Sequence, residues 1–127
     1  MFFADKLGEL VRAYRKLVAW QRGMDIVESV YRITRGFPTD EKYVLVPQLR
    51  RAAISIPSNI AEGNDRDSVL DHRRFITMAR SSVSEIETDL EIALRLRYIR
   101  REPFIELMNS LAEETRILLQ LRRSVVR

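Results

Sequence analysis

The residues of this chain best suited to binding chemistry are five arginines that the helix dipole does not account for. Most other arginines fall near the C-terminal ends of predicted helices, where the dipole favours a cation. An arginine side chain presents a planar fork of N–H donors that fits phosphate and carboxylate groups. We therefore expect any binding of nucleic acid, or of an acidic protein surface, to use these side chains. The five residues are Arg50, Arg51, Arg73, Arg74 and Arg80.

Acidic residues alternate along a later segment, but their spacing does not suit a metal site. On a helix, residues four apart share a side, so Glu85 pairs with Asp89 and Glu87 pairs with Glu91. The two pairs point in different directions, which favours a solvated or intersubunit face. These acids also offer ion pairs, within or between subunits, to the arginines of the preceding predicted helix, and this alternative to anion binding stays open.

The chain offers no set of residues that would perform catalysis. It has one histidine, His72, near the start of a predicted helix, where we expect a structural role. It has no cysteine, and its four glycines form neither of the common phosphate-binding motifs. No serine is combined with a plausible base and an orienting acid. We therefore predict no catalytic residue, no metal ligand and no cofactor, and a protein that is not an enzyme.

Apolar spacing predicts that helices alone position these residues. The first helix ends near Arg35, with Gly36 as the residue that terminates it. Residues 1–16 fit the same period without a clear cap, so we predict an N-terminal extension there and a bundle domain over 17–127. The apolar stripe of the first helix consists of Leu10, Ala13, Leu17, Trp20, Met24, Val27 and Tyr31.

The second predicted helix is introduced by the acidic and cap-forming cluster Thr39, Asp40 and Glu41. Pro47 is tolerated only in a first turn, so the regular helix should begin near residue 46, and Gly63 should end it. Short side chains (residues 52, 53, 55, 58 and 61) should let a neighbouring helix approach closely. The apolar stripe is Leu45, Leu49, Ala52, Ile56 and Ile60.

Two more helices complete the predicted fold. Ser68 and Asp71 resemble a capping box at the start of the third, which should reach about Tyr98, and Pro103 suits the first position of the fourth. Short connections make consecutive helices antiparallel, so we predict an all-α fold, an antiparallel up-down-up-down four-helix bundle. The stripes are Phe75, Met78, Ala79, Ser82, Val83, Ile86, Leu90, Ala93 and Leu94, then Phe104, Leu107, Met108, Leu111, Thr115, Leu118 and Val125.

Composition agrees with one folded domain. The 127 residues are 46% hydrophobic, and 22 Lys+Arg against 18 Asp+Glu give a net charge of +4. This mild positive charge permits contact with nucleic acid but does not require it. An arginine bias can also come from a genome rich in G and C. Neither an apolar run long enough to span a membrane nor a secretion signal is recognisable, so we expect a cytoplasmic protein.

The second predicted helix carries the most specific pattern in the chain. Residues 48–63 read QLRRAAISIPSNIAEG, and they are accompanied by Trp20, Phe37-Pro38 and Tyr98-Ile99. Over about residues 17–121 the chain resembles a family of four-helix-bundle proteins first noted as reading frames inside intervening sequences of bacterial 23S ribosomal RNA genes. Pro47 stands where that family usually has a small polar residue.

The resemblance implies a left-handed antiparallel bundle that assembles as a cyclic homo-oligomer, typically a pentamer, and an association with RNA without an established activity. A family of similar architecture serves as accessory protein to reverse transcriptases of diversity-generating retroelements. Two hypotheses remain open. The first is a non-catalytic, oligomeric RNA-binding protein whose phosphate contacts come from the five arginines. The second is a protein-interaction scaffold without nucleic-acid contact, in which large residues at Ala53 or Ser58 would disrupt the oligomer.

Overall fold

The computed structural model describes residues 13–126, and this part of the chain contains helices and no strand. The predicted all-α fold is thus confirmed there. Of the predicted extension over 1–16, only the last four residues are described, and residues 1–12 lie outside the described part. The elements are the 3₁₀ turns η1 (Ala13–Lys16) and η2 (Thr39–Glu41), and the α-helices α2 (Val18–Thr34), α3 (Leu45–Asn64), α4 (Val69–Arg95) and α5 (Arg101–Ser124).

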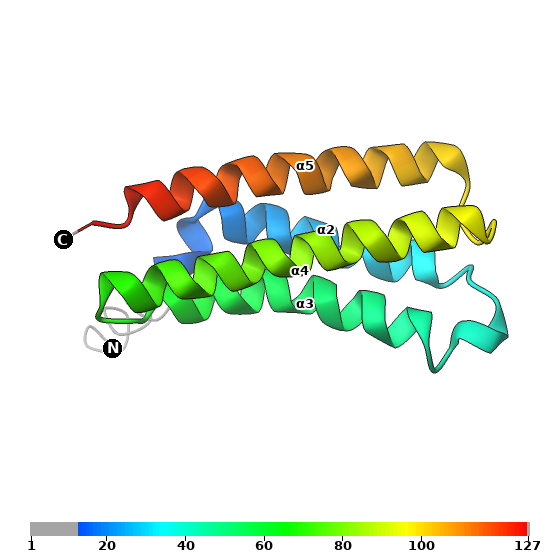
Figure 1. Cartoon of the computed structure of the whole chain (residues 1–127), viewed down its shortest axis with the longest axis horizontal. Helices are drawn as coiled ribbons and strands as arrows, with labels where there is room; N and C mark the ends of the chain where they lie inside the picture. Colours follow the sequence, from blue (N-terminus) through cyan, green and yellow to red (C-terminus); the bar gives the residue numbers. More distant parts are fainter. Residues whose placement is uncertain (1–12, 127) are drawn as a thin grey trace, which may run out of the picture.

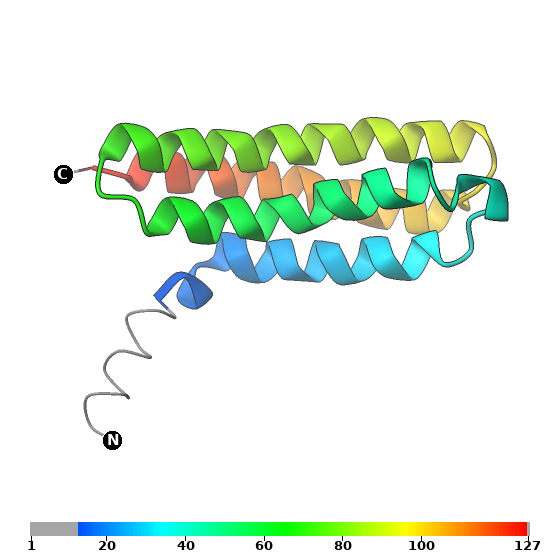
Figure 2. The same cartoon turned by 90° about the horizontal axis from the view of Figure 1, so that it is seen from below.

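The α-helices run up, down, up and down around one core, as predicted. The α2–α3 and α4–α5 connections lie at one end of the bundle, and the α3–α4 connection lies at the other (Figure 1). Each helix packs against the helices before and after it in the chain, and α5 packs back against α2 to close the ring. Figure 2 shows η1 turning away from the axis of α2. None of the helices within residues 13–126 has the length and apolar composition needed to cross a lipid bilayer.

All four α-helices contribute large aliphatic side chains to the core. Each such side chain stabilises the fold by roughly 1.5–3 kcal/mol when it is removed from water. The predicted stripe of α3 is buried along its whole length, whereas in α4 Met78 is 45% exposed and Ile76 is buried in its place. The most deeply buried aliphatic residues are Ile26, Val30, Leu49, Ile56, Ile60, Ile76, Val83, Ile86, Leu90, Leu111 and Leu118.

The buried face of α2 differs from the predicted one. The larger residues Leu17, Trp20 and Val27 lie half-buried beside the core, and Met24 is 38% exposed. The prediction was wrong because it followed large side chains such as Trp20 and Met24, whereas α2 approaches its neighbours through the small residues Ala19 and Gly23. Farther along α2, Ile26 and Val30 enter the core. The residues that α2 buries are Ala19, Gly23, Ile26, Val30 and Thr34.

The start of α3 agrees with the position predicted from Pro47, which lies in the first turn of the helix. The acidic cluster Thr39–Glu41 was predicted to open this helix, but it forms the separate turn η2. From that turn Glu41 still serves the helix N-terminus, because its Oε1 accepts a hydrogen bond from the backbone N–H of Leu45 at 3.4 Å. Its Oε2 accepts a second bond from the hydroxyl of Tyr98 at 2.8 Å, which links the two connections at this end of the bundle.

Of the two glycines predicted to terminate helices, Gly36 directly follows the C-cap residue Arg35 of α2, as predicted, whereas Gly63 does not end α3. The helix α3 continues past Gly63 to Asn64, and a Cβ atom at position 63 would lie 2.8 Å from the Cβ of Phe75. Gly63 therefore permits close packing of α3 against α4. Gly36 does follow α2, but it does not adopt a positive φ angle.

The C-terminal end of α4 is followed by a residue in the left-handed conformation, and this residue is an arginine. Arg97 has φ 64°, and α4 ends at Arg95 rather than at Tyr98 as predicted. The N–H of Tyr98 bonds to the carbonyl of Ala93 at 2.8 Å, and the N–H of Arg97 bonds to that of Leu94 at 3.0 Å. This pair of bonds is the Schellman motif, in which the residue at this position is usually glycine.

The starts of α4 and α5 are close to their predictions. The Ser68 hydroxyl accepts a hydrogen bond from the N–H of Asp71 at 2.9 Å, which confirms the predicted cap. Pro103 was predicted as the first residue of its helix and is the third. Either position suits proline, because the N–H groups of a first turn have no acceptor within the helix.

Candidate nucleic-acid interface

The five arginines predicted to bind an anion do not form one cluster in the protomer. Two of them lie on α3 and three on α4, and those that form contacts do so with different parts of the bundle. Three of the five are engaged by hydrogen bonds or an ion pair, and two have neither within residues 13–126.

Arg50 closes the C-terminal end of α2. Its Nε donates to the Thr34 hydroxyl at 2.9 Å, its Nη2 donates to the carbonyl of Tyr31 at 3.5 Å, and its guanidinium stacks 4.4 Å from the centre of the Tyr31 ring. A cation at the last carbonyls of a helix is favoured by the dipole. The contacts of Arg50 are therefore structural, and a phosphate would have to compete with them.

Arg73 and Arg74 are also held by neighbouring groups. The Nη2 of Arg73 donates to the carbonyl of Val125 at 2.8 Å, across from α4 to the end of α5. Arg74 forms an ion pair with Asp71 at 3.3 Å within the first turns of α4. The side chain of Arg74 is 66% exposed, so this pair is weak and can rearrange when an anion approaches.

Arg51 and Arg80 form no hydrogen bond or ion pair within residues 13–126. Arg51 lines a groove of about 390 Å³ between α3 and α4, together with Glu85. No ion pair joins these two side chains in the described part of the chain, although their pairing was one alternative from the sequence. Arg80 lines a smaller pocket of about 170 Å³ between α4 and α5.

Polar contacts hold α3 and α4 together beneath the groove. The amide nitrogen of Gln48 donates to both carboxylate oxygens of Asp89, at 3.1 and 3.2 Å, and the hydroxyl of Ser55 bonds to that of Ser82. Asp89 is 3% exposed, so its expected place on a solvated face is wrong. Burial raises the pKa of Asp89, the Gln48 hydrogen bond opposes that rise, and the charge of Glu85 adds to it.

Glu114 is a buried carboxyl group that the sequence analysis did not single out. It is 0% exposed in the core face of α5, and neither of its oxygens has a hydrogen-bond partner within residues 13–126. Burial raises its pKa to about 8, with Arg22 lowering the pKa and Glu113 and Asp25 raising it further. The signal was present in the sequence, because position 114 falls between Leu111 and Leu118 on the apolar stripe.

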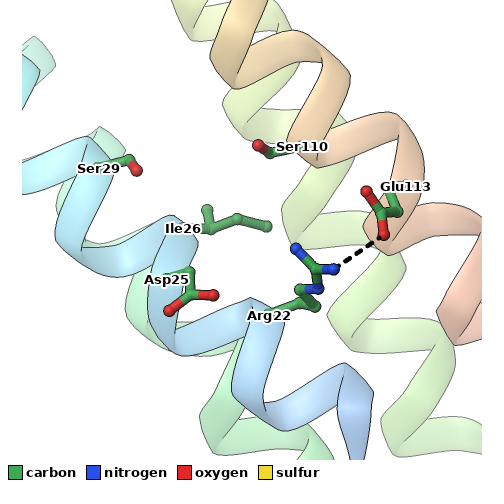
Figure 3. A pocket seen from close by; sticks show the side chains of 6 residues that line it. All are labelled: Arg22, Asp25, Ile26, Ser29, Ser110 and Glu113. Carbon is green, nitrogen blue, oxygen red and sulfur yellow. Dashed lines mark ion pairs between the residues drawn. The ribbon is translucent and has the colours of Figure 1, made fainter.

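The groups that act on Glu114 line a small surface pocket between α2 and α5. In Figure 3, Arg22 extends from α2 toward Glu113 on α5, and an ion pair of 3.5 Å joins them. The pocket has a volume of about 40 Å³ and also contacts Asp25, Ile26, Ser29 and Ser110. This volume is far below the roughly 300 Å³ at which organic ligands are usually enclosed.

The part of the chain that the structure describes was expected to hold no metal cluster and contains no group suited to one. Across residues 13–126 no group of three His, Cys, Asp or Glu side chains could hold a metal ion. His72 is partly buried and packs at the α3–α4 contact, where its Cδ2 would lie 3.3 Å from a Cβ at Gly63.

The family model described as 23S rRNA-intervening sequence protein matches residues 15–124, which is nearly the whole chain. The chain belongs to the 23S rRNA-intervening sequence protein family. The predicted resemblance is thereby confirmed. No curated protein matches the chain.

A solved structure supports the fold of this 23S rRNA-intervening sequence protein family member. A protein of unknown function from the S23 ribosomal protein family of Bacteroides thetaiotaomicron is similar to it, with a TM-score of 0.75 and 23% sequence identity. The match covers 84% of this chain and 100% of the other. At this identity the likeness concerns the fold.

The sixteen residues that carried the family resemblance form most of α3, and they divide between core and surface. Ala53 and Ile56 are 0% exposed, whereas Arg51 and Ser58 are exposed. Asn59 donates to the carbonyl of Ser55 at 2.8 Å along the groove. In this 23S rRNA-intervening sequence protein family member, the pattern thus specifies both the packing of α3 on its neighbours and the lining of the α3–α4 groove.

Proposed function

We propose that this chain is a non-catalytic, RNA-associated protein of the cytoplasm that works as a cyclic homo-oligomer, a pentamer in the simplest case. The observation that carries the proposal is the pair Arg51 and Arg80, whose side chains line surface hollows and form no hydrogen bond or ion pair with residues 13–126. Arginines of this kind bind phosphate groups without reading base sequence. The family assignment supports an origin connected with ribosomal RNA genes.

Oligomer formation would compensate for the small number of arginines that each protomer offers. A net charge of +4 spread over one protomer binds RNA weakly. A ring repeats each arginine around its circumference, and simultaneous contacts along one RNA strand raise the effective concentration of every further contact. We therefore expect binding that has little base specificity and falls steeply with salt.

The test is fluorescence anisotropy with a labelled 23S ribosomal RNA fragment between about 50 and 200 mM salt. The double variant Arg51→Gln/Arg80→Gln should bind at least about tenfold more weakly and show a smaller salt slope. The control is Arg95→Gln, which removes one charge where the double variant removes two, from an 80% exposed side chain paired with Glu91. Absence of binding at low salt, or equal losses in the double variant and the Arg95 control, would refute the proposal.

A protein-interaction oligomer without nucleic-acid contact is the second candidate, and exposed apolar residues favour it. Met78 is 45% exposed in the α3–α4 groove, and Ile92 is 43% exposed farther along α4. They are fourteen residues apart, so they lie on the same side of the helix. A second copy of the chain, or another protein such as a reverse transcriptase, would cover this stripe.

Light scattering on the double variant Met78→Lys/Ile92→Lys tests this second candidate, with loss of the oligomer as the expected result. Ser58→Trp probes the neighbouring surface of α3, because Ser58 is exposed. Ala53, which the sequence suggested as a similar probe, is 0% exposed inside the protomer. A large residue there would overpack the core and destabilise the protomer, so loss of the oligomer in such a variant would not report on the interface. An oligomer unchanged by the double Lys variant would exclude this face of α4.

A further inference from the structure

The pocket between α4 and α5 has the composition of a small oxyanion site, and we infer that it binds a phosphate group. This inference rests on the proposed function in one respect, because Arg80 is one of the two arginines to which that function assigns phosphate binding. It differs in that the site is local to one protomer and needs no oligomer.

The pocket places a positive charge in a hollow that no carboxylate from residues 13–126 lines. Its volume is about 170 Å³, and it is lined by Thr77, Arg80, Ser81, Ser84 and Thr115. No acidic residue lies one turn away from Arg80 on α4, at positions 76, 77, 83 or 84. The charge of Arg80 is therefore not neutralised by its own helix, and the volume suits a small ion better than a nucleobase or an organic cofactor.

The uncommitted polar groups of Arg80, Ser84 and Thr115 in this pocket can all donate hydrogen bonds. The guanidinium of Arg80 has no acceptor within residues 13–126, and its Nε is buried without a partner. The hydroxyls of Ser84 and Thr115 form no hydrogen bond to the described part of the chain either, and they come from the two helices that face each other. A phosphate oxygen only accepts hydrogen bonds, so it complements this set of donors.

The hydroxyl groups of Thr77 and Ser81 also line the pocket, but their protons are already donated to carbonyl groups of α4. The Thr77 hydroxyl donates to the carbonyl of Arg73 at 3.1 Å, and the Ser81 hydroxyl donates to the carbonyl of Thr77 at 3.2 Å. Their bonds along the helix leave oxygen lone pairs and methyl or methylene groups at the surface. A metal cation would find no carboxylate here and would be repelled by Arg80.

The α3–α4 groove and the α2–α5 pocket differ from the α4–α5 pocket because each contains an acidic side chain as well as an arginine. The α3–α4 groove that contains Arg51 includes Glu85, and the α2–α5 pocket that contains Arg22 includes Asp25 and Glu113. A carboxylate beside an arginine competes with an anionic ligand for the same N–H donors. Arg80 is thus the better placed of the two uncommitted arginines to hold a phosphate group.

Nuclear magnetic resonance of the ¹⁵N-labelled full chain tests the inference with inorganic phosphate at constant ionic strength. We expect saturable shifts of the Arg80 Nε–H resonance and of the Ser84 and Thr115 amides. The variant Arg80→Gln should weaken phosphate binding at least about tenfold. Thr115→Val removes one hydroxyl from the opposite helix at nearly constant volume and should weaken it severalfold, while Arg95→Gln should leave it unchanged.

A second titration, with a short single-stranded oligouridylate, separates the two sources of a phosphate group. Shifts of the same resonances, in competition with inorganic phosphate, would assign the site to the RNA backbone. Phosphate shifts without any response to RNA would support a free-anion site and refute the proposed function. Absence of a saturable phosphate shift in the wild-type chain, or an equal loss in Arg95→Gln, would overturn the inference. Absence of a saturable phosphate shift at Arg80, combined with RNA binding that depends on Arg51, would overturn the inference alone, while the proposed function would survive.

Discussion

The carboxyl group of Glu114 lies against the backbone of Gly23, where α5 meets α2. A Cβ atom at position 23 would come within 3.2 Å of Glu114 Oε2 and within 3.2 Å of the Cγ2 of Ile56. The glycine therefore provides the space in which the buried carboxyl sits. Because the carboxyl has no hydrogen-bond partner in the described part of the chain, its environment favours the neutral acid.

Ionisation of Glu114 should make the protein less stable at high pH. The pKa of Glu114 is about 8 in the folded state, whereas in the unfolded chain it should have its ordinary value of 4.5. Between these values the unfolded state releases a proton that the folded state keeps, so the stability due to the neutral acid is complete below about pH 4.5 and is lost as pH rises through 8. We expect a loss on the order of 4 kcal/mol, measured by urea unfolding at pH 5 and pH 9.

The variant Glu114→Gln isolates this effect from the other titrating groups. It keeps the size of the side chain but cannot ionise, so its free energy of unfolding should fall much less between the same two pH values. At pH 9 it should exceed that of the wild type. A wild type and variant with parallel pH profiles would show that Glu114 is ionised in the folded state.

Replacement of Gly23 by alanine should destabilise the bundle although alanine favours helix formation. The added methyl would press on Glu114 and Ile56, and such overpacking costs about 1–3 kcal/mol, against a gain in helix propensity of about 1 kcal/mol. Gly36→Ala is the matched control, because the nearest atom to a Cβ there is the Ile33 carbonyl oxygen at 3.8 Å. Thermal unfolding should show a lower midpoint for Gly23→Ala only. Equal midpoints would mean that the core adjusts freely.

Replacement of Arg97 by glycine should stabilise the protein. A residue with a Cβ atom is strained at φ 64°, whereas glycine adopts this conformation readily. We expect a gain of up to about 1 kcal/mol in the free energy of unfolding, because the glycine also makes the unfolded chain more flexible. Arg97→Ala keeps the strain and removes the charge, so it separates the two effects in the same denaturant series. A glycine variant no more stable than the alanine variant would contradict this explanation.

Loss of the Gln48 side chain should weaken the contact between α3 and α4. In Gln48→Ala the carboxylate of Asp89, which is 3% exposed, would lose both of its hydrogen bonds from the amide. An unsatisfied buried acceptor costs about 1–3 kcal/mol, and more when it is charged. The exposed residue Gln120 supplies the control, Gln120→Ala, which should change stability by less than about 0.5 kcal/mol. A double-mutant cycle with Asp89→Asn measures the coupling, and additive effects would rule it out.

The sequence by itself determined the features that depend on local periodicity and on caps. The apolar stripe of α3, the position of Pro47 in its first turn and the Ser68 cap of α4 were all correctly predicted. Each of these follows from contacts within a few residues along the chain. The family membership also followed from a continuous stretch, residues 48–63.

Only the tertiary structure decided which polar and small residues face a neighbouring helix. The burial of Glu114 beside Gly23, the close packing at Gly63 and the engagement of Arg50 by the end of α2 each join segments far apart in the sequence. Two arginines on neighbouring helices thus differ in their availability to a ligand, since Arg50 has an acceptor on another helix and Arg80 has none within residues 13–126. Local patterns carry no information about such a partner, because its position is set by the packing of the whole bundle.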